Sequence, residues 1–164
     1  MILDKATADR KLRRIAMEIA ERNHDKAELI LIGIKENGIF IAQKIAAYLN
    51  GVFPGKTTIV ALSMNKKQPD VITLDREVDV DGQCVLLVDD VANSGSTMLY
   101  ALKPFLNAHP EQIETVVLVE RTYKKFPIDI NYVGLSVATT KDENIIVEVE
   151  NGEVMGAVME LKIN

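Results

Sequence analysis

Two adjacent carboxylates and a run of small hydroxyl residues follow one apolar stretch of the chain. Asp89 and Asp90 come directly after the stretch 84–88, CVLLV, and the loop VANSGST follows at 91–97. Carboxylates can hold ribose hydroxyls, directly or through Mg²⁺, and small loop residues leave backbone amides free for a phosphate. The pattern indicates a sugar-phosphate site. The alternative is a plain turn in which Asp90 caps a helix, although one cap needs only one acid.

The element before the acid pair predicts where such a site lies. An unbroken apolar run such as 85–88 is typical of a strand that is buried on both faces of a parallel sheet. Open α/β sheets bind their ligands at the carboxyl ends of the strands. A helical pattern follows at 96–108, with Pro104 inside it. The acid pair and the loop 93–97 are therefore expected at the edge of the sheet that the carboxyl ends of its strands form.

A second strand–loop–helix unit lies earlier in the chain. The apolar run 29–34 ends in Lys35, Glu36, Asn37 and Gly38, and a helical pattern continues to Leu49. Because the carboxyl ends of parallel strands share one edge, this loop should lie near the acid pair. Lys35 places a cation where a second anion could bind.

The remaining periodicities predict an α/β fold with a mostly parallel sheet of five or six strands and helices on both faces. The strands are expected at 29–34, 57–62, 71–74, 85–88, 113–120 and 130–136, and the first helix at 7–22, capped by Thr7. The polar segment 63–70 is either a mobile lid or a plain hairpin connection. Asn151-Gly152 between alternating runs predicts a C-terminal hairpin. We expect a single domain over 1–164, with a core at about 24–136 and a small β hood at about 137–164 that includes the N-terminal helix.

Composition narrows the classes of protein that remain. The chain has 164 residues, 48% of them apolar and 26% charged, as in ordinary globular proteins. It shows no apolar run of membrane-spanning length and no signal pattern, and its single cysteine, Cys84, fits a reducing cytoplasm. The net charge of −5 disfavours non-specific nucleic-acid binding. The basic start of the first helix is either a solvated face or a face that binds RNA.

The segment 85–97 resembles the 5-phosphoribosyl-1-pyrophosphate (PRPP) motif of type I phosphoribosyltransferases. The whole chain is similar to the family of bifunctional pyrimidine-operon regulators and uracil phosphoribosyltransferases. More distantly, 119–122 and 132–134 are similar to hypoxanthine-guanine phosphoribosyltransferases. The pieces that carry the closer resemblance are 19–23, 33–35, 85–97, 119–121, 126–128 and 131–134.

The resemblance implies a reaction and a role for each group of residues. A nucleobase, expected to be uracil, displaces pyrophosphate from PRPP with Mg²⁺ present and gives UMP. Asp89 and Asp90 would hold the ribose hydroxyls or the metal, and the base would lie under the hood near Arg121, Tyr132 and Val133. A homodimer or a dimer of dimers is also implied. The loop residues expected to hold the 5-phosphate are Asn93, Ser94, Gly95, Ser96 and Thr97, and those expected to meet pyrophosphate are Lys35, Glu36, Asn37 and Gly38.

The sequence departs from these families at several positions. Asn93 stands where the purine enzymes carry a proton-handling Asp, which favours a pyrimidine that arrives ionised. Asn37 replaces an Arg, and Ser63-Met64 replaces a Tyr-Arg pair. Each lost charge-assisted contact to pyrophosphate predicts slower turnover by one or two orders of magnitude, at about 1.5–3 kcal/mol each.

The surface expected to bind RNA is also altered, and three functions are left open. Arg13 and Met17 replace the family's usual Thr and His, while Lys124, Lys125 and Lys141 remain as candidate phosphate contacts. The functions are a uracil phosphoribosyltransferase, a UMP-responsive RNA-binding regulator of pyrimidine genes, and a purine phosphoribosyltransferase.

Overall fold

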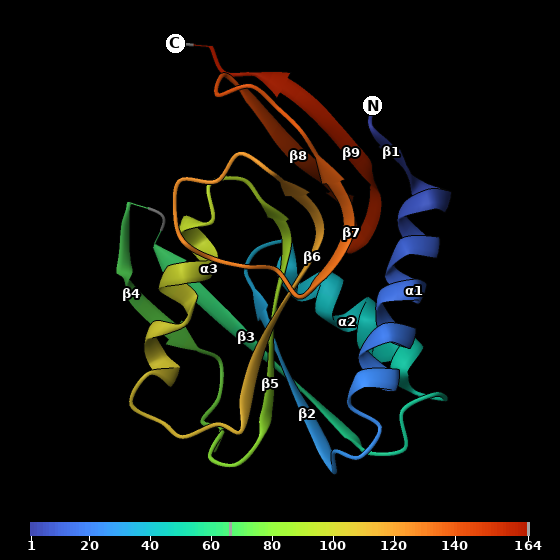
Figure 1. The fold of residues 1–164 in the computed structure, drawn as a ribbon, viewed down its shortest axis with the longest axis vertical. Helices are drawn as coiled ribbons and strands as arrows, with labels where there is room; N and C mark the ends of the chain where they lie inside the picture. The colour runs from blue at the N-terminus through green and yellow to red at the C-terminus, as the bar shows by residue number, and fades with distance from the viewer. Residues whose placement is uncertain (66, 164) are drawn as a thin grey trace.

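The structure, a computed structural model, describes residues 1–65 and 67–163, with residue 70 described through its backbone only. Its elements form a central sheet flanked by helices and a smaller sheet at one end (Figure 1). In chain order they are β1 (Leu3–Asp4), α1 (Lys5–Arg22), β2 (Glu28–Ile34), α2 (Gly38–Leu49), β3 (Lys56–Asn65), β4 (Gln68–Leu74), β5 (Cys84–Ala92), α3 (Ser96–Ala101), the 3₁₀ turn η1 (Lys103–Phe105), β6 (Gln112–Arg121), β7 (Tyr132–Val137), β8 (Glu143–Glu150) and β9 (Glu153–Leu161).

The central sheet has six strands in the order β4-β3-β2-β5-β6-β7. Every neighbouring pair is parallel except β3 and β4, which are antiparallel. The predicted mostly parallel sheet is therefore confirmed. Strand β5 lies between β2 and β6, so the segment that carries the acid pair lies inside the sheet rather than at its edge strands.

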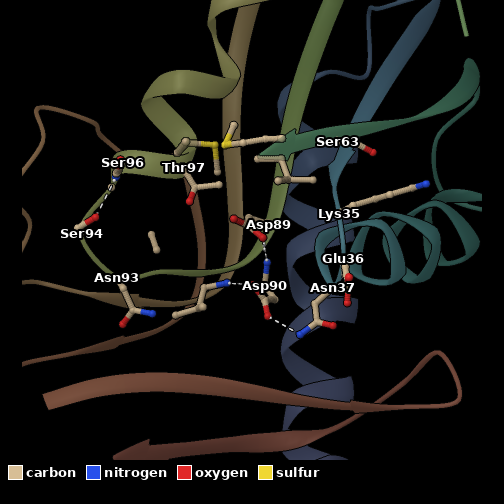
Figure 2. Close-up of a pocket in the computed structure, with 16 residues that line it drawn as sticks. Lys35, Glu36, Asn37, Ser63, Asp89, Asp90, Asn93, Ser94, Ser96 and Thr97 are labelled. Carbon is tan, nitrogen blue, oxygen red and sulfur yellow. Dashed lines mark hydrogen bonds between the residues drawn. The ribbon is translucent and has the colours of Figure 1, made fainter. Parts of the chain in front are cut away.

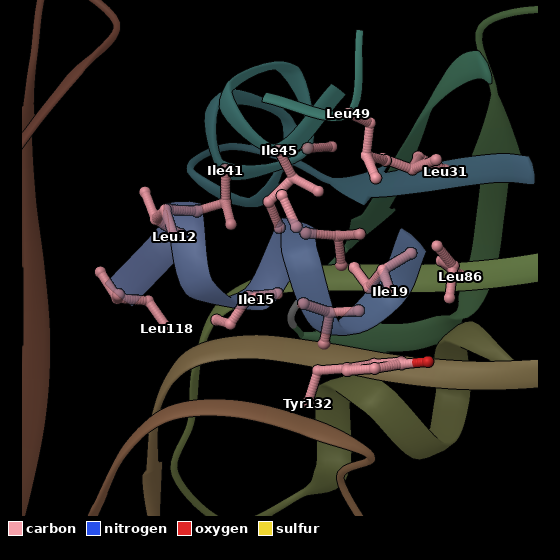
Figure 3. Close-up of a cluster of buried hydrophobic side chains, with 14 of the residues drawn as sticks. Leu12, Ile15, Ile19, Leu31, Ile41, Ile45, Leu49, Leu86, Leu118 and Tyr132 are labelled. Carbon is pink, nitrogen blue, oxygen red and sulfur yellow. The ribbon is translucent and has the colours of Figure 1, made fainter. Parts of the chain in front are cut away.

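Helices cover both faces of this sheet, as predicted. Along β5, Leu86 and Val88 pack into a cluster with α1 and α2, while Val85 and Leu87 pack into a second cluster with α3. Figure 3 shows the first cluster, where side chains of α1 and α2 meet those of the sheet. The alternation explains why 85–88 is continuously apolar, because each face of the strand meets a different hydrophobic layer.

The smaller sheet is the predicted hood, and it pairs the two ends of the chain. Its strand order is β1-β9-β8, and β1 and β8 both run antiparallel to β9. Asn151 and Gly152 form the turn between β8 and β9 with φ of 51° and 78°, values that favour Asn and Gly. The hairpin prediction is confirmed, and Asn164 at the end of the predicted hood lies outside the described residues.

The ends of two helices differ from the predictions. Helix α1 begins at Lys5, and its cap is Asp4, whose Oδ1 accepts a hydrogen bond of 2.7 Å from the Thr7 amide. The predicted helix at 96–108 is short, because α3 ends at Ala101 and Pro104 lies in the separate turn η1. Proline lacks an amide hydrogen and cannot continue the helical bonding pattern.

The segment 63–70 forms a hairpin rather than an exposed loop. Strand β3 continues to Asn65 and β4 begins at Gln68, so the strands meet through a very short connection. Lys66, which the predicted loop included, lies outside the described residues. Strand β7 begins at Tyr132 instead of residue 130. Within 1–65 and 67–163, no helix combines the length and the apolar character that crossing a bilayer requires.

Candidate functional site

The acid pair lies within strand β5 and not after it. Asp89, Val91 and Ala92 are in register with Val117, Val119 and Glu120 of β6, so the strand continues past both acids. The predicted end of the strand before Asp89 is wrong, because pairing with β6 keeps the backbone extended. The two carboxylates are therefore carried on a rigid element at the carboxyl edge of the sheet.

Both carboxylates accept hydrogen bonds from neighbouring amides. Asp89 Oδ1 accepts from the Asp90 amide at 2.8 Å, and Asp90 Oδ1 accepts from the Val91 amide at 2.8 Å. Asp90 Oδ2 accepts from Asn37 Nδ2 at 2.9 Å. These bonds orient the two acids toward one cavity without neutralising their charge (Figure 2).

A cavity of about 620 Å³ collects most of the predicted site residues. Its walls come from the ends of β2, β3 and β5 and from the start of α3 (Figure 2). The lining residues are Ile34, Lys35, Glu36, Asn37, Ser63, Met64, Asp89, Asp90, Val91, Ala92, Asn93, Ser94, Gly95, Ser96, Thr97 and Met98. The acid pair, the predicted phosphate loop and the predicted pyrophosphate loop thus face one space.

The loop 93–97 presents backbone amides to this cavity. Gly95 has φ of 85°, and a Cβ there would lie 2.5 Å from Ile128 Cγ2, so the turn requires glycine. Ser94 Oγ accepts from the Ser96 amide at 3.2 Å. The amides of Ser94, Gly95 and Thr97 donate to no acceptor in the part of the chain that the structure describes. Unpaired amides in such a turn suit an oxyanion.

The loop 35–38 crosses the opposite wall of the cavity. Lys35 and Glu36 are exposed, and the Lys35 side chain extends away from the two acids (Figure 2). Gly38 starts α2 and lies against β5, where a Cβ would come within 2.6 Å of the Val88 carbonyl oxygen. Gly38 is therefore a packing residue that lets the loop approach the acid pair, and it is not among the lining residues.

Two asparagines connect the site to the hood. Asn93 Nδ2 donates to the Ile145 carbonyl at 3.0 Å, and its Oδ1 accepts from the Ile145 amide at 3.1 Å. Asn37 Nδ2, besides bonding Asp90, lies 3.3 Å from the Val147 carbonyl. Both side chains were predicted to meet phosphate groups. The structure shows that their side chains fasten strand β8 across the site, and their contact with phosphate groups stays a prediction.

The three predicted base-binding residues are not part of this cavity. Tyr132 is fully buried, and its hydroxyl donates to Glu114 Oε2 at 2.9 Å. Burial raises the pKa of this hydroxyl above its ordinary value. The Val133 carbonyl accepts from Arg14 Nη2 at 3.0 Å. Both residues begin β7, where the register places Val133 level with Val117 of β6 and Asp89 of β5. The Tyr132 side chain is committed to the interior, and the expectation that the base lies near these two residues stays a prediction.

Arg121 lies at the correct edge of the sheet but faces a different cavity. Its guanidinium bonds Thr139 Oγ1 and the Thr140 carbonyl, each at 2.8 Å, and is 5.7 Å from the centre of the Tyr123 ring. The cavity that it lines has a volume of about 210 Å³ and shares only Asn93 and Ser94 with the larger one.

Six lining residues were not predicted as ligand contacts: Ile34, Ser63, Met64, Val91, Ala92 and Met98. Ser63 and Met64 were assigned to a loop because the segment is polar, and the hairpin places them on the wall. Ile34 and Met98 end a strand and start a helix, and nothing in their residue types distinguishes them from core residues. Their position at the carboxyl edge is the signal that could have identified them.

Two arginines in the basic first half of α1 make contacts within the fold. Arg14 Nη2 bonds the carbonyls of Val133 and Gly134, each at 3.0 Å, and Arg13 lies over the Tyr48 ring at 5.1 Å. These contacts attach α1 to β7 and α2. They favour a structural role for these two arginines over a surface held ready for RNA.

The donor set of the larger cavity suits Mg²⁺ shared with a substrate. No cluster of three or more potential ligands from His, Cys, Asp and Glu occurs among residues 1–65 and 67–163. Asp89 and Asp90 supply two hard carboxylates, and Mg²⁺ commonly combines one or two carboxylates with substrate oxygens and water. The residues therefore fit a metal that arrives with the substrate.

Comparison of the sequence with known proteins identifies a family. Residues 1–151 match the family described as phosphoribosyl transferase domain. The bifunctional protein PyrR of Enterococcus faecalis is 34% identical over 172 residues, covering 99% of this chain and 97% of the relative. The pyrimidine operon regulatory protein of Lactococcus lactis is 34% identical over 152 residues, covering 90% and 88%.

The fold is similar to that of solved phosphoribosyltransferases. The hypoxanthine phosphoribosyltransferase of Trypanosoma cruzi superposes with a TM-score of 0.80 over 99% of this chain and 97% of that one, at 16% identity. At this identity the likeness concerns the fold alone. It confirms the predicted fold class, an α/β fold with a mixed, mostly parallel central sheet.

Proposed function

This chain belongs to the phosphoribosyltransferase family, and from that membership we propose that it transfers the phosphoribosyl group of PRPP to uracil, forming UMP and pyrophosphate. The observation that carries the proposal is the single cavity of about 620 Å³ that the acid pair shares with the loops 93–97 and 35–37. PRPP has a ribose diol between a 5-phosphate and a 1-pyrophosphate, and these three elements match its three parts.

The proposed binding mode follows from the donors and acceptors of each wall. The amides of Ser94, Gly95 and Thr97 hold the 5-phosphate, and the hydroxyls of Ser94, Ser96 and Thr97 supplement them. Asp89 and Asp90 hold the ribose hydroxyls. The loop 35–37 and the start of α2 meet the pyrophosphate, where the helix dipole favours negative charge.

The reaction needs positioning and charge compensation rather than a covalent nucleophile. The bond from ribose C1 to the pyrophosphate oxygen breaks with its electron pair on that oxygen, and a nitrogen of the ionised base forms the new bond to C1. Asp89 and Asp90 lie on a paired strand, so they stabilise the developing positive charge without reorganisation. A bound Mg²⁺ would neutralise charge on the leaving group.

A pyrimidine acceptor is favoured by the way in which Asn93 is bound. Its amide bonds Ile145 through both polar atoms, and a carboxamide does not exchange a proton near pH 7, so it cannot serve a purine ring as a carboxylate would. The relative named as a pyrimidine operon regulatory protein points to the same class of base. We place the base beside the last residues of β7 and the loop that follows, instead of beside Tyr132 and Val133.

The test is pyrophosphate release from PRPP and Mg²⁺ with a panel of uracil, cytosine, hypoxanthine and guanine. Release that depends on uracil and is lost in Asp90→Asn supports the proposal. Release with guanine or hypoxanthine alone would favour the purine alternative. No release with any base, from a protein that melts cooperatively, contradicts transferase activity.

A regulatory function is the second candidate, because the relatives carry names such as bifunctional protein PyrR and pyrimidine operon regulatory protein. In this function UMP occupies the same cavity and changes the affinity of the protein for a leader RNA of pyrimidine genes. Gel-shift titrations with and without UMP test it, and binding should weaken as salt rises. Sedimentation of the same samples tests the implied homodimer. The absence of a UMP-dependent shift would contradict the regulatory function.

A further inference from the structure

Asn37 precedes helix α2 at the position where an asparagine usually caps a helix. A capping asparagine accepts a hydrogen bond from an amide of the first helical turn through its side-chain oxygen. In this structure the Asn37 side chain forms no such bond. Its amide group is turned toward strand β5 and the hood instead, so helix capping does not account for the asparagine at this position.

The Asn37 amide nitrogen joins the acid pair to the hood. It donates to Asp90 Oδ2 at 2.9 Å, a bond that Figure 2 shows, and to the Val147 carbonyl at 3.3 Å. An amide nitrogen carries two hydrogens, and these two bonds use both of them. While both bonds hold, the Asn37 side chain has no donor left for a phosphate oxygen.

The bond from Asn37 completes the positioning of the Asp90 carboxylate. Asp90 Oδ1 accepts from the amide of the next residue, Val91, at 2.8 Å. One bond to one oxygen lets the carboxylate turn about that contact, and the bond from Asn37 holds the second oxygen from a different element. Among residues 1–65 and 67–163, Asn37 is the only residue whose side chain hydrogen-bonds Asp90.

Packing of the next residue holds Asn37 close to the acids. A Cβ on Gly38 would lie 2.6 Å from the Val88 carbonyl oxygen and 3.2 Å from Asp89 Oδ1, so only glycine allows the loop to lie this close to β5. The Asn37 amide therefore reaches Asp90 from a backbone that the fold already fixes.

On the hood side, Asn37 bonds an edge strand. Strand β8 is the last strand in the order β1-β9-β8, so the outer backbone groups of β8 have no strand partner. Ile145 and Val147 are two residues apart and present these groups on the same edge. Asn93 bonds Ile145, and Asn37 bonds Val147. Of the two asparagines, only Asn37 connects this edge to a carboxylate of the acid pair.

We propose that Asn37 is a positioning residue that fixes the orientation of Asp90 and the position of strand β8 with one amide group. Asp90 is then held for reaction only while the hood lies over the site. This inference rests on the proposed transferase function and adds a residue to it. Pyrophosphate meets the backbone of the loop 35–38, and the Asn37 side chain acts through Asp90.

The kinetic test is pyrophosphate release with PRPP and uracil varied separately. Asn37→Ala removes both bonds, so kcat should fall by at least about tenfold and the KM for uracil should rise, while the KM for PRPP stays within about twofold. Asn37→Gln keeps the amide on a longer side chain and should recover part of kcat. Asn50→Ala, which changes an exposed asparagine at the other end of α2, is the matched control and should alter none of these values.

Hydrogen–deuterium exchange of the segment 143–150 gives a second measurement, which needs no activity. Exchange in this segment should rise in Asn37→Ala. It should also rise in Asp90→Ala, because Asp90 is linked to β8 through Asn37 and its loss leaves that amide less restrained. Asn50→Ala should exchange like the wild-type protein, and thermal melting verifies that each variant is folded.

A raised KM for PRPP with unchanged kcat and an unchanged KM for uracil would assign the Asn37 side chain to pyrophosphate and overturn the proposal. Wild-type kinetics in Asn37→Ala, or exchange of β8 that responds to neither variant, would overturn it too. A wild-type protein that releases no pyrophosphate with any base contradicts the transferase function alone, and the exchange measurement then decides whether Asn37 links Asp90 to β8.

Discussion

The two ends of the parallel sheet carry similar polar residues and use them in opposite ways. At the carboxyl end, Asp89 and Asp90 line a cavity of about 620 Å³. At the amino end, Asn23, Tyr132 and Glu114 are linked by hydrogen bonds of 2.9 to 3.3 Å beneath α1. We call the second group the closed network, and its members are Asn23, Cys84, Gln112, Glu114 and Tyr132.

This difference shows that the type of a polar residue does not tell whether its side chain binds a ligand or stabilises the fold. In the closed network Asn23 is 1% exposed, and its amide bonds Ile19, Glu114, Tyr132 and Gln112. Networks whose members are all paired stabilise a fold and specify its packing. At the carboxyl end both acids line the cavity, where a ligand can reach them. Changes at the two ends should therefore separate activity from stability.

The largest effect is expected for Asp90→Asn at the open end. Loss of the charge should lower kcat for pyrophosphate release by at least about a hundredfold, or about 3 kcal/mol, because the charge stabilises the transition state. Thermal melting should fall only slightly, since the amide oxygen keeps one of the two hydrogen bonds, from Val91 or from Asn37. Asp25→Asn, an exposed acid near the other end of the sheet, is the control and should change neither quantity. A near-normal rate in Asp90→Asn would contradict the proposed role.

Asn23→Ala should give the reverse result at the closed end. It leaves Glu114, Gln112 and Tyr132 with missing partners, so the free energy of unfolding should fall by about 3 kcal/mol. For a chain of this size that lowers the melting temperature by about 10 °C. Activity per folded molecule should be unchanged, and Asn50→Ala on the surface should be silent. If Asn23→Ala lowered kcat with normal melting, the two ends would not be separable.

Alkaline titration tests the closed network without a mutation. Burial raises the pKa of the Cys84 thiol from 9.0 to about 11. Between these values the unfolded chain loses the thiol proton and the folded chain keeps it, so stability should fall by about 2 kcal/mol as pH rises. Denaturant titrations from pH 8 to 11 measure the slope. Cys84→Ala should make the free energy of unfolding depend less steeply on pH, and adding Tyr132→Phe should reduce the remaining dependence. An unaltered slope in both variants would refute this explanation.

Asn93 tests the boundary of the comparison, because it lies at the open end and yet bonds the hood through both atoms of its amide. Asn93→Ala removes both hydrogen bonds to Ile145, so the hood should fit less well over the site and the KM for the acceptor should rise by about tenfold. Asn93→Asp keeps the acceptor oxygen and loses the donor, so its KM should lie between those of the wild-type protein and Asn93→Ala. Identical KM values in all three proteins would show that the hood does not act through Asn93.

The smallest effect is expected for Tyr132→Phe. Only the hydroxyl is removed, so stability should fall by about 1 kcal/mol through the lost bond to Glu114. The KM for the acceptor should not change, because the ring lies under α1 and away from the cavity. A raised KM would restore Tyr132 as a base-binding residue and would break the comparison between the two ends.

The sequence by itself determined the layers of the fold and the position of the main site. The run 85–88 is apolar at every residue because both of its faces are covered, and that pattern is local to the chain. The acid pair and the loop 93–97 are also local, since a strand that ends in a turn presents them together wherever the sheet lies. These features required no knowledge of distant contacts.

The tertiary structure alone decided which polar groups are free. Asn93 and Asn37 look like ligand-binding residues in the sequence, but strand β8, more than fifty residues further along the chain from Asn93, takes up their amides. Tyr132 looks like a base-binding residue until α1 covers it. A hydrogen bond or a charge pairing depends on the partner's position in space, and residue spacing along the chain does not contain that position.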